Sequence, residues 1–427
     1  MVKLSQCMIV KNEEQNIERA LGWAKDIAFE QIVVDTGSTD RTVEIAKSLG
    51  AKVYHFKWID DFAAAKNYAM EQATGDWIAI LDADEYMTHE DAKLLIEVLY
   101  KIQEDDEMSD ECDSISCRFI NLDENGNTLT IESNQRFYRN RPYLRFKGRI
   151  HEAVALEKRD IYINELSIYH TGYTKSETAD KNKKERNLKM LRVEYEEDPT
   201  NPDIMHYLAN ALGVQESEED KKEAEDLHLK ALSNDRVPKT NNKILAYDFL
   251  IPRLISQDRK DEAIELCTRA ISELKGYLDY SYYRAVAYNK AGEFNKAFND
   301  LKECEDILFS NNEKPVTRIL VSSPLPLFYQ ITVSAEGLRD EALYKKYSQV
   351  INSTIKDNKN KEAIIGPFIR AMTWYGVPDD KVMSRLAEVY DVSSPSDLMI
   401  IARAAKESGA IEFTRNILAL IGNLLGK

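Results

Sequence analysis

Apolar residues in the first part of the chain form short continuous runs, separated by stretches with helical spacing. Three runs, at residues 4–10, 31–34 and 51–56, suit buried strands, and apolar positions between them recur every three or four residues. Strands that alternate with helices of about ten to fifteen residues predict parallel βαβ units with right-handed crossovers. We therefore expect an α/β sheet at the start of the chain.

A fourth apolar run, at residues 77–81, is followed by Asp82, Ala83, Asp84 and Glu85. The carboxyl ends of the strands in an open α/β sheet face the ligand crevice, so acids placed there can bind a hard cation through their oxygens. A solvated acidic turn is the alternative interpretation. The predicted strands upstream favour the cation site.

Two further polar residues lie near the predicted sheet edge. Asp35 follows the second run, in a loop without the glycines of a G-x-G-x-x-G turn or a P-loop, which disfavours a dehydrogenase and a P-loop kinase. Its carboxylate can accept hydrogen bonds from a ribose or a base. Lys66 lies in the opening turns of a helix predicted from Phe62, where it is either functional or a solvated helix residue.

The pattern becomes helical after residue 176. Small residues lie seven positions apart in three segments, which start at Ala224, Ala263 and Ala297 at intervals of 39 and 34 residues. The segment YYRAVAYNKAGEFNKAFNDLKEC resembles a tetratricopeptide unit, whose period is about 34 residues. Looser copies are expected near residues 340–350, 381–389 and 396–420, and the apolar last helix suits a cap or a subunit contact. Stacked helix pairs of this kind commonly bind peptide on a concave surface.

Composition narrows the function classes. The 427 residues exceed one typical core and favour two or three units. A net charge of -16 argues against nucleic acid and anionic lipid as partners. No run approaches the roughly 20 apolar residues that span a bilayer, and the N-terminus does not fit a signal peptide, so we expect a cytoplasmic protein. The five cysteines form no C-x-x-C pair and are expected to be reduced and packed.

Four motifs carry a resemblance to a known family. CMIVKNEE, VVDTGSTDRT, AKNYA and GDWIAILDADE occur in this order and resemble the catalytic domain of family 2 glycosyltransferases, an α/β nucleotide-diphospho-sugar transferase domain with the A-type fold. The resemblance covers about the first 175 residues. It implies a UDP-sugar donor, a bound Mn²⁺ or Mg²⁺, and inversion of the anomeric centre in one displacement that needs a base.

The resemblance also implies roles for individual residues. It implies that Asp84 coordinates the metal and that Asp82 approaches the ribose or the metal shell. The expected donor-binding set is Val10, Glu13, Asp35, Lys66, Asp82, Ala83 and Arg136.

Residues 113–121 and 128–138 predict a β-hairpin around Asn125 and Gly126, which we expect to close over the crevice. The arginine-rich run RFYRNRPYLRFKGR follows from Arg136. It is either a solvated basic loop or a set of donors for the diphosphate leaving group, for which arginine is geometrically suited.

Glycosyltransferases with attached helical repeats, including enzymes that glycosylate bacteriocin peptides through S- or O-links, are similar to this chain at two later places. The similarity suggests Glu152 as the general base and His170 as a metal ligand, roles that a carboxylate and a neutral imidazole can fill. The alternatives are a His151 and Glu152 pair that orders a loop and a His170 that caps a strand. Many family 2 enzymes carry Glu-Asp where this chain has His-Glu, which leaves the base open.

We therefore expect a metal-dependent inverting glycosyltransferase domain at residues 1–175 and a tetratricopeptide-like helical domain at residues 176–427. The expected acceptor is a Ser, Thr or Cys side chain of a peptide or protein, and the helical domain is a candidate homodimer contact. Transfer to a cell-envelope glycan precursor and a non-catalytic scaffold are the alternatives.

Overall fold

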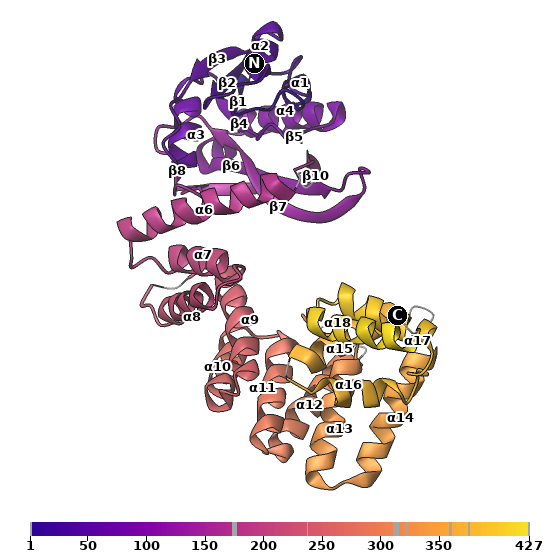
Figure 1. Cartoon of the computed structure of the whole chain (residues 1–427). Coiled ribbons are helices and arrows are strands. Elements are labelled where there is room, and N and C mark those ends of the chain that lie inside the picture. Colours follow the sequence, from indigo (N-terminus) through magenta and orange to yellow (C-terminus); the bar gives the residue numbers. More distant parts are fainter. Residues whose placement is uncertain are drawn as a thin grey trace. The chain divides into compact units, whose positions relative to one another are not determined.

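A computed structural model describes residues 2–172, 177–236, 238–310, 316–320, 323–357, 361–374 and 376–425 (Figure 1). The chain divides into two compact units, Met1–Ala211 and Leu212–Lys427. Each unit is considered by itself. No helix within the described ranges is long and apolar enough to cross a membrane.

An eight-stranded mixed sheet forms the centre of the first unit, with strand order β3-β2-β1-β4-β7-β6-β10-β5. A second, two-stranded sheet pairs β8 with β9. The strands are β1 (Leu4–Val10), β2 (Glu30–Asp35), β3 (Lys52–His55), β4 (Trp77–Ile80), β5 (Glu85–Tyr86), β6 (Cys112–Leu122), β7 (Thr128–Arg139), β8 (Phe146–Lys147), β9 (Ala153–Val154) and β10 (Arg159–His170).

The four strands predicted from apolar runs are present, and β3, β2, β1 and β4 pair in parallel. The predicted hairpin of β6 and β7 is also present, and its pairing with the central sheet was not predicted. β7 pairs antiparallel with β4, with Trp77 opposite Arg139, so the hairpin extends the central sheet. The pairing satisfies backbone groups of β4 that would otherwise form an open sheet edge.

Helices cover both faces of this sheet. One core places Trp77 and Phe137 against Leu95 of the fourth helix, and another places Ile78 against Met70 of the third. Burial on both faces explains why β4 is a continuous apolar run. The helices of the first unit are α1 (Ile17–Gly22), α2 (Thr42–Ser48), α3 (Phe62–Glu71), α4 (His89–Glu104), α5 (Asp106–Glu111), α6 (Glu177–Glu197) and α7 (Pro202–Gly213), the last of which ends just beyond Ala211.

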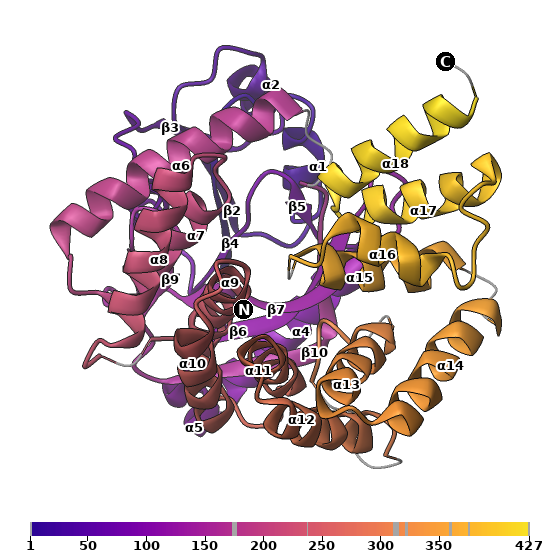
Figure 2. The same cartoon turned by 60° about the horizontal axis from the view of Figure 1, so that its bottom comes forward.

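The second unit is helical throughout its described elements. Its helices are α8 (Glu218–Leu232), α9 (Thr240–Ser256), α10 (Lys260–Glu273), α11 (Leu278–Ala291), α12 (Phe294–Leu308), α13 (Leu325–Leu338), α14 (Glu341–Asp357), α15 (Lys361–Trp374), α16 (Asp379–Leu386), α17 (Pro395–Glu407) and α18 (Ile411–Leu424). Figures 1 and 2 show them following one another in chain order along a curve.

The predicted tetratricopeptide-like unit is formed by α11 and α12. Gly292 ends α11 in the left-handed conformation with φ 76°, which glycine adopts without steric cost. The small residues spaced seven apart are fully buried on α8, α10 and α12 and let the paired helices approach closely. The segment 396–420 covers most of α17 and part of α18, and the chain turns between them at Gly409 with φ 82°.

Candidate active site

The site begins where β1, β2 and β4 end at the same edge of the sheet. Val10 is in register with Asp35, and Cys7, three residues earlier, with Ile80. Thr36 joins the first two strand ends, because its N–H and its hydroxyl both donate to the carbonyl of Val10, at 2.9 and 3.0 Å. Ala83 is buried against Met8 and Val10.

The loops after β1 and β2 hold each other in place. The Asp35 carboxylate is buried and accepts from the N–H groups of Gly37 and Ser38, at 3.2 and 3.0 Å. Burial alone would raise the pKa of Asp35, but the hydrogen bonds from Ser38 outweigh it and hold this pKa below its ordinary value. The backbone N–H of Glu13 donates to Thr42 Oγ1 at 2.7 Å. Asp35 therefore ends β2 as the sequence predicts, ionised and ordering its loop, and Glu13 contacts the first residue of α2.

Strand pairing brings the acidic turn after β4 next to the end of β10. β5, which follows the turn, pairs antiparallel with the end of β10 so that Glu85 lies opposite His170. The N–H of Thr171 donates to the carbonyl of Asp84 at 3.1 Å. As a result, His170 Nε2 lies 3.5 Å from Asp84 Oδ2.

Asn121 on β6 sets the orientation of the His170 ring. Its Oδ1 lies 2.7 Å from His170 Nδ1, while its Nδ2 donates to Thr130 Oγ1 at 2.8 Å. With the amide oriented this way, Nδ1 donates to Asn121 and Nε2 lies on the side of Asp84. In histidines that bind metals, a hydrogen bond at the other ring nitrogen of this kind orients the ring.

A carboxylate oxygen and an imidazole nitrogen that converge in this way fit a divalent cation that takes its remaining ligands from a diphosphate and water. Within the described ranges, no group of three or more His, Cys, Asp or Glu side chains forms a complete cation site. Asp84 and His170 are the candidate protein ligands for such a cation.

Gly172 keeps the space between these two side chains open. A Cβ atom at this position would lie 2.3 Å from His170 Nε2 and 2.7 Å from Asp84 Oδ2, closer than real Cβ contacts. This role of Gly172 was not predicted from the sequence. The signal was its position two residues after the proposed histidine ligand.

Lys66 joins two carboxylates from different parts of the sequence. Its Nζ lies 2.7 Å from Glu152 Oε1 and 3.5 Å from Asp82 Oδ1, and the residue is buried on α3. Burial opposes the charge on Lys66, but Asp82 and Glu152 outweigh it and hold the pKa of Lys66 above its ordinary value. Burial likewise opposes the charge on Asp82, and Lys66 keeps the pKa of Asp82 low. The solvated alternative for Lys66 is therefore wrong.

Arg136 lies on β7 and binds a carboxylate of the chain itself. Its Nε and Nη2 donate to the two oxygens of the buried Glu85, at 2.9 and 2.7 Å. Burial opposes the charge on Arg136, and Glu85 nevertheless keeps the pKa of Arg136 above its ordinary value. The pair links β7 to β5, and Asp82 lies within electrostatic reach of the guanidinium.

The rest of the arginine-rich run is also partnered. Arg139 lies over the ring of Trp77, Arg141 pairs with Asp113 at 2.9 Å, and Arg145 donates to backbone carbonyls. The arginine-rich run therefore does not form a solvated basic loop.

The loop that carries Glu152 is attached to α6 and α7. Arg149 donates through Nε and Nη2 to the carboxylate of Glu197, at 3.1 and 2.5 Å, and its N–H donates to Glu194 Oε1 at 3.1 Å. The His151 ring stacks on Tyr207 with centroids 4.3 Å apart, and His151 has a left-handed φ of 56°. The contact of Tyr207 could not be predicted, because it joins two segments with no local pattern in common.

Comparisons with known proteins identify the family of this chain. The model of the family "Glycosyl transferase family 2" matches residues 5–158. A TPR repeat-containing protein of Synechococcus elongatus is 30% identical over 322 residues, which cover 71% of this chain and 75% of that protein. The chain belongs to glycosyl transferase family 2. Its helical repeats are shared with the cyanobacterial relative, and family membership supports a nucleotide-sugar donor.

Other relatives of this family 2 glycosyltransferase match shorter parts. The glycosyltransferase SunS of Bacillus phage SPbeta is 29% identical over 232 residues, which cover 53% of this chain and 52% of SunS. Staphylococcus aureus TarS, residues 1–349, solved in complex with UDP-GlcNAc, aligns at 16% identity and a TM-score of 0.33 over 82% of this chain and 92% of that chain.

Proposed function

We propose that this glycosyltransferase transfers a sugar from a UDP-sugar to a Ser, Thr or Cys side chain of a polypeptide, with inversion. The observation that carries the proposal is the meeting of Asp84 and His170 at the sheet edge where β1, β2 and β4 end. Glu152 reaches the same acidic turn through Lys66. The cation ligands and the proposed base therefore flank one turn.

The donor-binding residues have separate tasks in this proposal. Asp35, Glu13 and the backbone at Val10 border the place for the uridine, and Asp82 with Ala83 faces the ribose. Asp84 and His170 would hold Mn²⁺ or Mg²⁺, which supplies positive charge to the diphosphate when bound. Arg136 forms an ion pair with Glu85, the residue after Asp84, and adds positive charge to the turn.

Glu152 accepts the acceptor proton. The hydroxyl or thiol attacks the anomeric carbon, the bond from that carbon to the phosphate oxygen breaks, and UDP leaves with the electron pair. The acceptor proton passes to a Glu152 oxygen, while Lys66 orients the carboxylate at 2.7 Å. Attack opposite the leaving group inverts the anomeric centre.

A polypeptide acceptor is the choice that fits the repeats, because stacked helix pairs suit an extended chain. We also propose that the protein acts in the cytoplasm. A homodimer through the helical unit stays a prediction; the exposed apolar side chains of α18, such as Ile411 and Leu418, are its candidate contact.

The test is incubation of the full chain with candidate peptides, a panel of UDP-sugars and Mn²⁺, followed by mass spectrometry. The expected product is a peptide heavier by one sugar at a Ser, Thr or Cys. Replacing each candidate acceptor residue by Ala identifies the linkage. UDP-sugar consumption with glycan precursors as the sole acceptors would contradict the proposal and favour the cell-envelope alternative.

A further inference from the structure

A row of polar side chains crosses three neighbouring strands beside the acidic turn. His170 on β10 is in register with Asn121 on β6, and Asn121 is in register with Thr130 on β7 (Figure 1). Two residues further along β7, Glu132 lies on the same side of the sheet as Thr130, because side chains of a strand alternate between its faces. Thr130 and Glu132 therefore form the outer end of a row that leads to the proposed cation ligand.

Asn121 connects this outer end to the histidine. The residue is only 2% exposed, so its amide group needs hydrogen-bond partners within the protein. Its Nδ2 donates to Thr130 Oγ1 at 2.8 Å and to Glu132 Oε1 at 3.3 Å, and its Oδ1 lies 2.7 Å from His170 Nδ1. The direction of the amide therefore decides which kind of group faces the imidazole.

Glu132 determines that direction. A threonine hydroxyl can donate or accept, so Thr130 alone is compatible with either end of the amide, whereas a carboxylate only accepts. Glu132 Oε1 lies 3.3 Å from Thr130 Oγ1 and accepts the hydroxyl hydrogen, which leaves Thr130 only lone pairs to offer to Asn121. Both groups on β7 therefore act as acceptors, and the NH₂ end of the amide has to point toward them.

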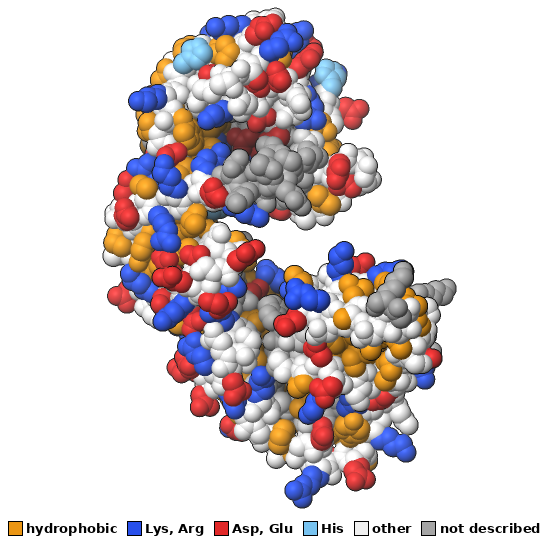
Figure 3. Space-filling model, in the orientation of Figure 1, with side chains coloured by type: hydrophobic (Ala, Val, Ile, Leu, Met, Phe, Trp, Pro, Cys, Tyr) orange, Lys and Arg blue, Asp and Glu red, His pale blue; other side chains and the backbone are white. Residues whose placement is uncertain are grey.

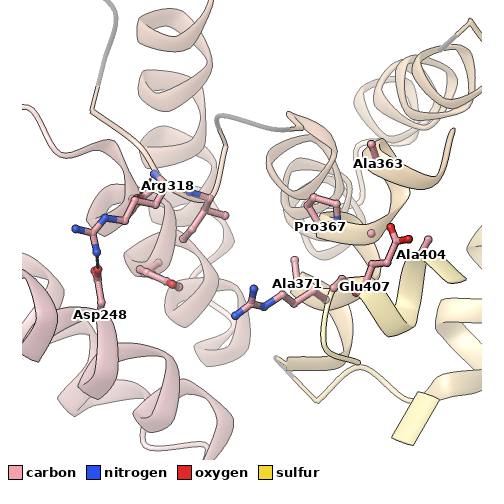
Figure 4. A pocket seen from close by; sticks show the side chains of 13 residues that line it. Asp248, Arg318, Ala363, Pro367, Ala371, Ala404 and Glu407 are labelled. Carbon is pink, nitrogen blue, oxygen red and sulfur yellow. Dashed lines mark hydrogen bonds and ion pairs between the residues drawn. The ribbon is translucent and has the colours of Figure 1, made fainter. Parts of the chain in front are cut away.

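Glu132 differs in this respect from carboxylates that form ion pairs elsewhere in the chain. Beside the cavity of about 480 Å³ in the helical unit, for example, Asp248 pairs with Arg318 at 2.5 Å (Figure 4). The partners of Glu132 among the described residues are a neutral amide and a neutral hydroxyl. Its effect is therefore to orient donors rather than to balance a positive charge.

The amide oxygen of Asn121 is left facing His170. Because an amide oxygen only accepts, Nδ1 has to donate the proton. We propose that Glu132 and Thr130, acting through Asn121, fix the tautomer of His170, with the proton on Nδ1 and the lone pair of Nε2 on the side of Asp84. Glu132 and Thr130 are positioning residues, because they act on His170 only through another side chain.

The tautomer decides whether His170 can bind a cation together with Asp84. A neutral imidazole binds a metal ion through the ring nitrogen that carries the lone pair, and Nε2 lies 3.5 Å from Asp84 Oδ2. With the proton on Nε2, the ring would donate to Asp84 and compete with the cation. This consequence rests on the proposed function, whereas the tautomer itself rests on the hydrogen bonds of Asn121.

The first test determines the tautomer in the full chain without metal. Two-bond ¹H–¹⁵N spectra of protein labelled at histidine, recorded at about pH 8, distinguish the two neutral tautomers. The signal of His170 among the six histidines is assigned with His170→Gln. Glu132→Lys replaces the acceptor by a donor, and Glu132→Ala removes it. Glu124→Lys is the matched control, because it makes the same change of charge at an exposed position in the turn between β6 and β7. Circular dichroism confirms that each variant is folded.

We expect His170 to carry its proton on Nδ1 in the wild type and in Glu124→Lys. Glu132→Lys should move the proton to Nε2, because an ammonium group only donates and turns the amide oxygen of Asn121 toward itself. Glu132→Ala should show both tautomers, since the Thr130 hydroxyl can then donate or accept. A proton on Nε2 in the wild type, or wild-type spectra in both Glu132 variants, overturns the inference.

The second test measures the affinity for Mn²⁺ by calorimetry in the presence of UDP. Glu132→Lys should bind Mn²⁺ about 10-fold to 100-fold more weakly than the wild type, which is the usual effect of losing the outer partners of a metal-binding histidine. Glu124→Lys should bind Mn²⁺ as the wild type does. A changed tautomer with an unchanged Mn²⁺ affinity, or with an equal loss in Glu124→Lys, contradicts His170 as a cation ligand and therefore the proposed function alone. The inference alone is overturned if Mn²⁺ strengthens UDP binding while the tautomer does not depend on Glu132.

Discussion

Lys66 forms ion pairs with two carboxylates that come from different loops of the site. The sequence placed it in the opening turns of a helix but left its environment open, because helical position alone does not tell a buried lysine from a solvated one. The structure buries it between Asp82 and Glu152. The two acids lie 70 residues apart in the chain, and only the folded sheet brings them to the same ammonium.

Replacing Lys66 by Met should destabilise the protein by about 1–3 kcal/mol, because Glu152 loses its partner in a largely buried place. The loss stays below that of a fully buried pair, since 42% of the Asp82 side chain is exposed. Urea denaturation at pH 7 measures it, and Lys66→Arg is the control that keeps the charge. An unchanged midpoint in Lys66→Met would contradict the role.

The same variant should show a smaller deficit in acid. Lys66 helps to hold the folded-state pKa of Asp82 below its ordinary value, so this stabilisation is present above the unfolded-state pKa, about 3.9, and is lost as the pH falls through the lower folded value. Denaturation curves at several pH values below about 4 should therefore converge for Lys66→Met and the wild type.

Asp84→Ala should abolish cation-dependent donor binding and leave the fold intact, because it removes one of the two proposed cation ligands. Calorimetry with UDP, with and without Mn²⁺, measures the effect. Asp123→Ala, in the exposed turn between β6 and β7, is the matched control. UDP affinity in Asp84→Ala that still rises on addition of Mn²⁺ would exclude the proposed ligand.

Glu152→Gln should leave donor affinity within a few-fold and slow transfer to a Ser acceptor by about 10²-fold or more, since Gln cannot accept the proton. With a Cys acceptor the loss should be smaller, because a thiol with a pKa of about 8.5 is already partly ionised at neutral pH. Single-turnover assays with both acceptors test this. Turnover near that of the wild type with Ser would assign the base to another residue.

At the scale of elements, the loop at residues 148–152 is the part of the site that depends on helices outside the sheet. Arg149 pairs with Glu197 of α6, and His151 stacks on Tyr207 of α7. Because Glu152 follows directly, these contacts fix the position from which its carboxylate reaches Lys66. The helical segment after β10 therefore supports the position of Glu152, the proposed base.

Tyr207→Ala should lower kcat for transfer by about 10-fold to 100-fold, because small displacements of a catalytic group have effects of that size. The dissociation constant for UDP with Mn²⁺ should stay unchanged, since Tyr207 contacts the loop of the base and not the acidic turn. Tyr207→Phe keeps the ring and should restore kcat. Equal losses in both variants, or a loss confined to donor affinity, would contradict this role.

Much of the fold was predictable because its elements have local patterns. The apolar runs of β1, β2 and β4 and the turn at Asn125 and Gly126 were visible in the sequence and are present. The placement of β7 beside β4 was not, because a pairing between distant strands depends on which edge remains open after the parallel strands assemble. The meeting of Asp84 and His170 was suggested by motifs, whereas the contacts of Asn121 and Tyr207 had no local signal.

At the scale of the whole molecule, compactness divides the chain after Ala211, whereas the change from strands to helices occurs near the proposed boundary at residues 175 and 176. The difference is α6 and most of α7, which pack with the sheet unit. On the face that Figure 3 shows, acidic and basic side chains are interspersed on the helical unit. A truncation should therefore retain the whole of the first unit.

A chain that ends at residue 213 should keep UDP-sugar hydrolysis and lose most transfer to a polypeptide. It retains the loop contacts of α6 and α7 but lacks the helical unit that is proposed to bind the acceptor. A chain that ends at residue 176 should hydrolyse more slowly than this, since Arg149 and His151 lose their partners. Thermal melts confirm that both chains are folded. Peptide transfer with an unchanged KM by the 213-residue chain would leave the helical unit without an acceptor role.

All five cysteines are buried free thiols, as the sequence predicted. Burial raises the pKa of each thiol, to about 11 for Cys112 and about 12 for Cys117. Alkylating reagents react with exposed thiolates, so the folded enzyme should remain unlabelled by iodoacetamide at neutral pH. A cysteine-containing acceptor can therefore be titrated in an unfractionated reaction mixture, where any loss of its alkylation reports an S-linked sugar directly. A cysteine introduced on the surface would likewise accept a fluorophore at a single position, without removal of the native five.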